Sequence, residues 1–221
     1  MLLACLAFVE LDYLWALHKQ VSLLACLTNE EYRVWQRFGS SRRRREYVGA
    51  RLAAKLAFCS LRGASQLWNV EIVLDSEGRR FIGDPKDAQC FLPVSISHDR
   101  RWAAAIVSLM TKQTVGLDIL DVPGRSISVE GLHMIERFQA VSLREQQRCW
   151  ALKEAAAKAT GLGLNFKPAA IVNFTQKGFQ WLALPAEYDQ TRLHLLSASV
   201  SRHFVLAIAF GQSIENASTE P

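Results

Sequence analysis

The two halves of this chain echo each other, and this repetition constrains the fold more than any other feature of the sequence. Three blocks recur in the same order: a helical segment, a hairpin signal that ends in glycine, and a pair of strand-like segments. The matching ranges are 50–55 and 153–158, 72–78 and 171–178, and 95–106 and 197–208. Three matches in one order predict two copies of a unit in which a helix packs on an antiparallel sheet. We therefore expect an α+β fold with two similar helix-plus-antiparallel-sheet halves related by pseudo-two-fold symmetry.

The length and apolar content of the chain suffice for a buried core in each half. The chain has 221 residues, of which 50% are hydrophobic, and this excludes a disordered tail or a disulfide-stapled miniprotein. We place the N-terminal half at residues 1–112 and the C-terminal half at residues 113–211. The polar residues 212–221 are expected to form a flexible tail.

The apolar opening of the chain, residues 1–9, is predicted to form a buried first strand. No basic segment precedes it, it ends at Glu10, and a bilayer span needs about 20 apolar residues. A signal peptide is the alternative that this segment leaves open. The five cysteines include no C-x-x-C pair, so neither a disulfide framework nor a zinc site is indicated. We expect reduced cysteines in a cytoplasmic protein that does not enter a membrane.

Local signals predict where two of the helices begin and where one of them ends. Residues 28–31 (Thr-Asn-Glu-Glu) and 142–145 (Ser-Leu-Arg-Glu) both have the capping-box pattern of a helix N-terminus. Gly161 is suited to end the second of these helices in a left-handed turn.

A carboxylate on a predicted strand and a charged pair on a predicted helix are the first candidates for chemistry. Strand alternation over residues 115–120 places Asp118 on a largely apolar strand, where it is either a capped strand end or a functional acid. Glu154 and Lys158 are four residues apart on a helix, which is also the spacing of an ordinary exposed ion pair. The small residues 155–157 would let this helix lie close to a strand, so that Glu154 approaches Asp118. Two such carboxylates would repel unless a cation such as Mg²⁺ lay between them.

The segment Ser97-His98-Asp99 is the second candidate, in a connection between two predicted strands. Three adjacent residues cannot form a hydrolase triad, and the sequence has no G-x-S-x-G motif, so we set aside a serine hydrolase. His98 is then either a phosphate contact or an ordinary turn histidine.

A basic cluster comprises residues 42–45, Arg51 and Lys55, in a chain whose net charge is +5. Such a cluster is either a solvated face or a site for a nucleic acid, an acidic protein or a multiply phosphorylated cofactor. The sequence has no P-loop and no G-x-G-x-x-G motif, so side chains would have to hold any nucleotide-like ligand.

These motifs together resemble the 4′-phosphopantetheinyl transferases, and specifically the longer, internally duplicated group of the surfactin-synthetase-activating type. Residues 115–118 (Val-Gly-Leu-Asp) are similar to the first motif of that family, and residues 150–158 fit its W-x-x-K-E-x-x-x-K motif at every fixed position. Residues 95–98 resemble its S-H segment, and Gly78-Arg79 is similar to its G-K-P turn, with Arg for Lys and without Pro. Arg45 lies where the family has an arginine for coenzyme A. The resemblance covers residues 45–210.

The resemblance implies an enzyme that transfers phosphopantetheine from coenzyme A to a serine of an acyl or peptidyl carrier protein and releases adenosine 3′,5′-bisphosphate. It implies Asp118, Glu154 and Lys158 as catalytic residues, with Asp118 and Glu154 as ligands of Mg²⁺ or Mn²⁺ between the two halves. The residues that it implies for coenzyme A are Arg45, Arg79, Ser97, His98, Lys153 and Lys158. It also implies a monomer, with an acidic carrier protein as partner and without nucleic acid.

One departure from the family pattern concerns the metal ligands. Many members of the duplicated group have a second acid two residues after the aspartate, where this sequence has Leu120. Asp121 does not replace it, because strand alternation turns Asp121 to the opposite face. The missing acid leaves open a non-catalytic module that binds coenzyme A or a carrier protein. The basic cluster leaves open a nucleic-acid-binding protein.

Overall fold

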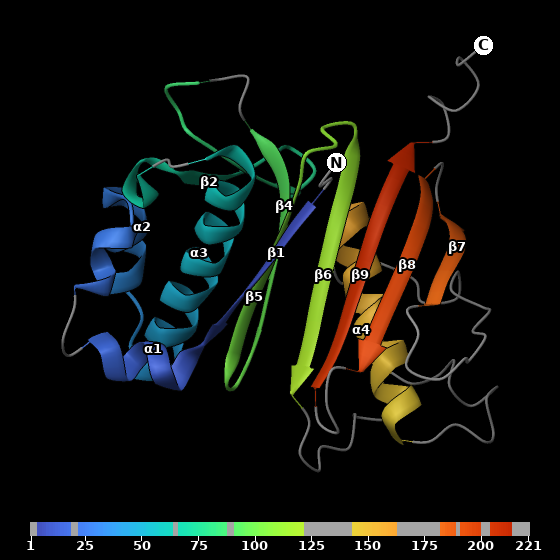
Figure 1. Ribbon diagram of the computed structural model, residues 1–221, viewed down its shortest axis with the longest axis horizontal. Helices are drawn as coiled ribbons and strands as arrows, with labels where there is room; N and C mark the ends of the chain where they lie inside the picture. The colour runs from blue at the N-terminus through green and yellow to red at the C-terminus, as the bar shows by residue number, and fades with distance from the viewer. Residues whose placement is uncertain are drawn as a thin grey trace. The chain divides into compact units, whose positions relative to one another are not determined.

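The computed structural model describes residues 4–18, 22–63, 66–87, 91–121, 143–162, 182–188, 191–199 and 204–213. These residues belong to two compact units, Met1–Lys112 (unit 1) and Gln113–Pro221 (unit 2). In each unit a long helix lies on an antiparallel sheet (Figure 1).

Unit 1 contains a five-stranded sheet in the order β1-β5-β4-β3-β2. Its strands are β1 (Ala4–Glu10), β2 (Glu71–Leu74), β3 (Arg80–Gly83), β4 (Leu92–Asp99) and β5 (Trp102–Ser108). Its helices are α1 (Leu11–His18), α2 (Asn29–Gln36) and α3 (Ser41–Arg62), with short 3-10 turns at Leu23–Cys26 and Leu67–Asn69. The long helix α3 packs against β1, β4 and β5, where alanines of the helix are fully buried.

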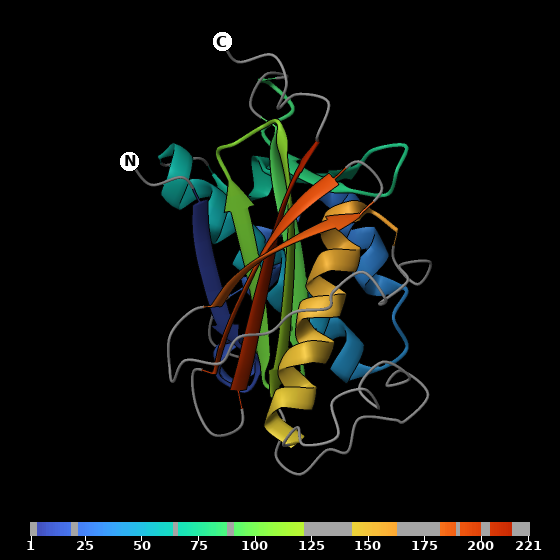
Figure 2. The same cartoon turned by 90° about the vertical axis from the view of Figure 1, so that its right-hand side faces the viewer.

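Unit 2 contains a four-stranded sheet in the order β6-β9-β8-β7. Its strands are β6 (Gln113–Asp121), β7 (Leu182–Tyr188), β8 (Thr191–Ser199) and β9 (Phe204–Ser213), and its helix is α4 (Leu143–Thr160). Figure 2 shows α4 running along the sheet, and α4 contacts β6, β8 and β9. Four alanines of this helix are fully buried, so that its backbone lies close to the strands.

The two units repeat one arrangement, as the sequence repetition predicts. In unit 1 the first strand pairs with the last, and the last pairs with the strand before it; β6, β9 and β8 repeat this in unit 2. The long helix of each unit packs on these three strands. Helix α3 packs on β1, β5 and β4, and α4 packs on β6, β9 and β8. The prediction of two helix-plus-antiparallel-sheet halves is confirmed, whereas pseudo-two-fold symmetry stays a prediction. The second hairpin block, 171–178, lies outside the described residues.

The structure confirms two predicted signals at helix ends. Thr28 and Glu31 form the predicted capping box, in which Glu31 N donates to Thr28 Oγ1 at 3.2 Å and Thr28 N donates to Glu31 Oε2 at 3.0 Å. Gly161 has a φ of 75°, which confirms the predicted left-handed turn after α4. Ser142 lies outside the described residues.

Two predictions about the chain ends are wrong in part. The opening segment is a strand, but β1 is an edge strand of the unit 1 sheet, and Val9 is its one buried described residue. The predicted flexible tail begins too early, because Gln212 and Ser213 belong to β9, where Gln212 pairs with Gln113. Polar composition suggested a tail, but backbone pairing to a neighbouring strand holds polar residues as readily as apolar ones. No helix among the described residues is long and apolar enough to cross a membrane.

Lys55 does not belong to a solvated basic face, which corrects one part of the predicted basic cluster. Its side chain is fully buried, and Nζ donates to Cys26 O at 2.7 Å and to Glu31 Oε2 at 2.6 Å. Burial raises the pKa of the nearby Cys26 thiol to about 11. Lys55 therefore ties α3 to the start of α2 and is not available to an external ligand.

Candidate functional site

The close approach of α4 to β6 depends on Gly116. A Cβ atom at this position would collide with the carbonyl oxygen of Ala155 and would lie 2.8 Å from the backbone nitrogen of Ala159. The helix backbone thus lies directly on the strand backbone, which only glycine permits here. Asp118 follows two residues later on the same strand face, and Glu154 and Lys158 directly precede Ala155 and Ala159. The glycine therefore brings the strand acid to the charged residues of the helix.

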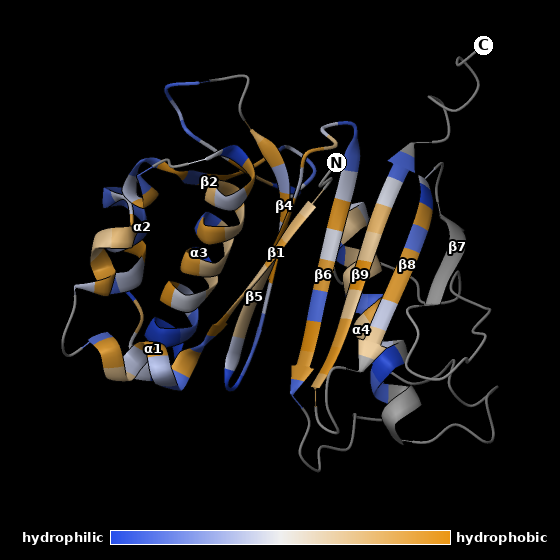
Figure 3. Ribbon diagram, in the orientation of Figure 1, coloured by the Kyte–Doolittle hydropathy of each residue, from blue (hydrophilic) through white to orange (hydrophobic). Residues whose placement is uncertain are grey.

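Asp118 and Lys158 form an ion pair between β6 and α4. Lys158 Nζ donates to Asp118 Oδ1 at 2.8 Å and to the backbone oxygen of Leu117 at 2.9 Å. Asp118 is buried and Lys158 is partly buried, so solvent screens this pair only in part. In Figure 3 a hydrophilic band interrupts the apolar middle of β6, and Asp118 is the charged residue within positions 115–120.

Glu154 lies within electrostatic range of both Asp118 and Lys158. Its pKa is raised above the ordinary value of 4.5, first by burial and then by the negative charge of Asp118, and the positive charge of Lys158 opposes this shift. The sequence-based expectation that Glu154 approaches Asp118 is therefore met. Two carboxylates and one ammonium group share this part of unit 2.

This donor set fits a hard divalent cation. Carboxylate oxygens are the protein ligands that Mg²⁺ prefers, and a cation would relieve the repulsion between Asp118 and Glu154, which adds to burial in raising the pKa of Glu154. Among the described residues no group of three or more potential metal ligands is found. Leu120 packs against the apolar cluster of unit 2. Asp118 and Glu154 would thus be the two protein ligands, with water completing the coordination.

The raised pKa of Glu154 predicts that unit 2 is more stable without this carboxylate at neutral pH. A carboxyl whose pKa is higher in the folded than in the unfolded chain costs stability progressively as the pH rises from about 4.5 through the folded-state pKa. With a chelator present, Glu154→Gln should therefore raise the melting temperature at pH 7 and change it little at pH 4. Thermal unfolding at both pH values measures this, with Glu30→Gln, which removes an exposed ion pair with Arg33, as the control. A variant that is less stable than the wild type at pH 7 would contradict the prediction.

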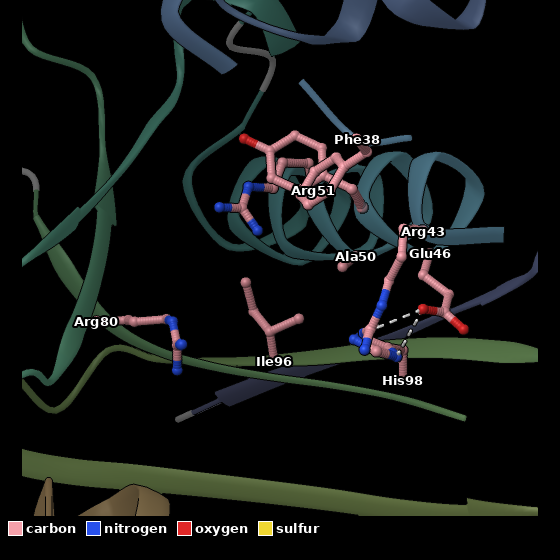
Figure 4. Close-up of a pocket in the computed structure, with 9 residues that line it drawn as sticks. Phe38, Arg43, Glu46, Ala50, Arg51, Arg80, Ile96 and His98 are labelled. Carbon is pink, nitrogen blue, oxygen red and sulfur yellow. Dashed lines mark ion pairs between the residues drawn. The ribbon is translucent and has the colours of Figure 1, made fainter. Parts of the chain in front are cut away.

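A separate pocket of about 230 Å³ lies within unit 1, between α3 and the sheet (Figure 4). Its polar lining is mostly cationic and also contains one buried carboxylate. The lining residues are Phe38, Arg43, Glu46, Tyr47, Ala50, Arg51, Arg80, Ile96 and His98. Such a lining favours an anion that also carries an apolar or aromatic part.

Two guanidinium groups of this pocket repel each other. The pKa of Arg80 is lowered, first by desolvation and then by the positive charge of Arg51, although more than a third of the Arg80 surface stays accessible. Arg51 stacks on Tyr47, with its guanidinium carbon 4.2 Å from the ring centroid, and Glu31 lies 3.6 Å away as a partial counter-charge. No ion pair among the described residues includes Arg80. An anion between Arg51 and Arg80 would relieve this repulsion.

One of the coenzyme A residues predicted for the N-terminal half lines this pocket, namely His98. Ser97 is buried one position earlier on β4, and alternation turns its side chain to the other face of the sheet. Lys153 and Lys158 belong to α4 in unit 2, where Lys153 is buried.

Arg45 and Arg79 are held elsewhere by acids. Arg45 Nη1 contacts Asp12 Oδ1 at 2.5 Å, and Arg79 contacts Asp75 at 2.8 Å and Glu77 at 2.9 Å. Arg79 is part of the β2–β3 turn, in which Gly78 has a φ of 79°. Neither arginine lines the pocket.

Simple periodicity explains which arginines reach the pocket. On α3 the pocket residues recur at positions i, i+3, i+4, i+7 and i+8 from Arg43, which is one face of a helix, whereas Arg45 lies on another face. On β3 neighbouring side chains alternate, so Arg80 reaches the pocket while the preceding Arg79 stays in the turn. The predicted basic cluster includes Arg43 and Arg51 without separating them from Arg45, and it does not include Arg80, although the helical and strand periods contain the signal.

Comparisons with known proteins give structural neighbours only. No protein-family model matches the chain, and no curated protein matches it. A holo-(acyl-carrier-protein) synthase from Bacillus anthracis in complex with CoA (3′,5′-ADP) is similar with a TM-score of 0.42 and 23% identity, over 48% of this chain and 92% of that chain. A holo-[acyl-carrier-protein] synthase from Thermotoga maritima is similar with a TM-score of 0.36 and 22% identity, over 52% of this chain and 67% of that chain.

Proposed function

We propose that this protein is a 4′-phosphopantetheinyl transferase, which moves phosphopantetheine from coenzyme A to a serine hydroxyl of an acyl or peptidyl carrier protein. The observation that carries the proposal is the contact of two motifs. The strand motif that contains Gly116 and Asp118 lies against the helix motif that contains Glu154 and Lys158. Each motif resembles a part of the phosphopantetheinyl transferase pattern, and their acids and lysine share one site.

Asp118 and Glu154 would hold Mg²⁺ in unit 2, with Mn²⁺ as the alternative ion. When bound, the metal neutralises negative charge on the pyrophosphate oxygens. In the proposed reaction the serine oxygen bonds to the phosphorus next to pantetheine, the bond from that phosphorus to the bridging oxygen breaks, and adenosine 3′,5′-bisphosphate leaves. Glu154, directly or through a water, takes the serine proton. Lys158 stabilises charge on the leaving phosphate.

We assign the 3′-phosphate of the nucleotide to the unit 1 pocket. Arg43, Arg51, Arg80 and His98 supply positive charge there, and Tyr47 supplies an aromatic face. Desolvation and the positive charge of Arg51 lower the pKa of Arg80. An anion bound there would relieve the repulsion between these two arginines. Arg45, Arg79, Ser97 and Lys153 stay predictions from the family resemblance. The same holds for an acidic carrier protein as partner, a monomeric state, a cytoplasmic location and the absence of nucleic acid binding.

Two adjacent arginines of β3 and its turn test this assignment. Arg80→Gln should weaken the binding of adenosine 3′,5′-bisphosphate by about tenfold or more, because it removes one of the three arginines that line the pocket. Arg79→Gln should change the affinity by less than about twofold, since Asp75 and Glu77 already pair with Arg79. Isothermal titration calorimetry measures both constants. A larger loss from Arg79→Gln than from Arg80→Gln would reverse the assignment.

The function itself is tested by product release. The folded protein is incubated with coenzyme A, Mg²⁺ and an apo carrier protein, and adenosine 3′,5′-bisphosphate is quantified by chromatography. Release should require the metal and should stop when the modified serine of the carrier is replaced by alanine. Nucleotide binding without release, on every carrier tried, would favour a non-catalytic module that binds coenzyme A.

A further inference from the structure

The unit 1 pocket contains a negative charge that anion binding alone does not explain. The Glu46 side chain is only 3% exposed, yet it lines the same pocket as Arg43, Arg80 and His98. A buried carboxylate lowers the affinity of a pocket for a bare anion, because like charges repel at short range. A carboxylate at this place favours a ligand that carries a hydrogen-bond donor beside its anionic group.

The two oxygens of Glu46 have different partners. Oε1 accepts a hydrogen bond from Arg42 Nε at 2.6 Å, and this interaction is the main cause that raises the pKa of Arg42. Oε2 lies 3.5 Å from Arg43 Nη1 and 3.9 Å from His98 Nδ1, and both ion pairs are drawn in Figure 4. Oε2 is buried and has no hydrogen-bond partner among the described residues. One acceptor oxygen in the pocket is thus left for a ligand, directly beside the Arg43 guanidinium and the His98 imidazole.

We propose that Glu46 Oε2 accepts a hydrogen bond from a ligand hydroxyl that neighbours the phosphate held by Arg43 and His98. This inference rests on the proposed function, in which the ligand is a nucleotide with a 3′-phosphate. In such a ribonucleotide the 2′-hydroxyl is on the carbon next to the phosphorylated one. A phosphate and a hydroxyl donor on adjacent carbons match an arginine and a histidine that each lie within 4 Å of one acceptor oxygen. Glu46 would thereby select 3′-phosphorylated ribonucleotides over 2′-deoxynucleotides and bare phosphates.

A purely structural role for Glu46 makes a different prediction. If Glu46 only positioned Arg42 and Arg43, its removal would weaken every phosphate ligand to the same degree, whether or not a hydroxyl is present. If Glu46 accepts a hydrogen bond from the ligand hydroxyl, its removal weakens ribonucleotide binding more than deoxyribonucleotide binding. The ratio of ribo- to deoxyribonucleotide affinity therefore separates the two roles.

The experiment is a calorimetric titration of the full chain with adenosine 3′,5′-bisphosphate and with 2′-deoxyadenosine 3′,5′-bisphosphate. The wild type should bind the ribonucleotide about tenfold more tightly or better, as expected for a hydrogen bond to a charged group. Glu46→Ala should bring the ratio close to one and should strengthen the binding of inorganic pyrophosphate. Glu46→Gln keeps a carbonyl acceptor and should retain part of the preference. Glu30→Gln, which removes a solvent-exposed glutamate on α2, should leave the ratio unchanged.

The outcomes separate this inference from the proposed function. Equal affinity of the wild type for both nucleotides would overturn the role of Glu46 and leave the transferase proposal intact, and this comparison needs no variant to fold. An unchanged ratio in Glu46→Ala, shown to be folded by circular dichroism, would overturn it as well. If the wild type bound neither nucleotide, the nucleotide site in unit 1 and the inference built on it would both be wrong.

Discussion

Replacing either Asp118 or Glu154 by alanine is expected to abolish phosphopantetheine transfer, with a loss of roughly a thousandfold or more in kcat/KM. The two carboxylates share one site with Lys158, and burial together with the charge of Asp118 raises the pKa of Glu154. Removal of one leaves the metal with a single protein ligand, and removal of Glu154 also removes the proposed proton acceptor. Steady-state transfer to an apo carrier protein measures the effect.

Two controls make this result specific. Leu120 lies on the same strand face as Asp118 and packs against apolar residues. Leu120→Ala removes only apolar contacts, so it should change transfer far less than either acid variant. Without metal, adenosine 3′,5′-bisphosphate should still bind the acid variants, because the residues assigned to its 3′-phosphate belong to unit 1. A Glu154→Ala protein with near-normal transfer would refute the roles assigned to these residues.

Gly116→Ala is expected to destabilise unit 2 by about 3 kcal/mol, the upper range for overpacking a buried site. The added methyl group would meet backbone atoms of Ala155 and Ala159, which cannot rotate away as a flexible side chain would. The helix would have to move off β6, and this movement would also separate Lys158 from Asp118. Urea unfolding gives the free energy, and transfer activity should fall with it.

Gly39→Ala is the matched control for this substitution. A Cβ atom at Gly39 has no heavy atom within 4 Å, so the same chemical change should alter stability by less than about 0.5 kcal/mol. If both variants were equally stable, the direct packing of α4 on β6 would not be required, and the account of how Glu154 reaches Asp118 would lose its basis.

The sequence predicted the parts of the structure that depend on regular periods and on repetition. Three repeated blocks predicted two units with one arrangement, and small residues of α4 beside Gly116 correctly indicated the approach of Glu154 to Asp118. The W-x-x-K-E-x-x-x-K pattern contains Glu154 and Lys158, which lie near Asp118, and their catalytic role stays a prediction.

The unit 1 pocket was harder to predict because charge runs do not show which residue each charge meets. The run Arg42–Arg45 covers every side of a helix: Arg42 and Arg43 pair with Glu46, Arg45 pairs with Asp12, and Arg44 Nε donates to Phe38 O. Repetition alone is also insufficient, because the helical lysine of each block meets a different partner. Lys55 pairs with a glutamate of α2, whereas Lys158 pairs with an aspartate of β6. These partners come from parts of the chain that the repeated blocks do not include.

Intact-protein mass spectrometry of apo carrier proteins tests the central claim most directly. Each carrier is incubated with this protein, coenzyme A and Mg²⁺, alongside a chelator control and the Glu154→Ala variant. The account predicts a gain in carrier mass of one phosphopantetheine group, dependent on the metal and absent with the variant. No gain on any acyl or peptidyl carrier protein, from folded protein shown to bind coenzyme A, would contradict it.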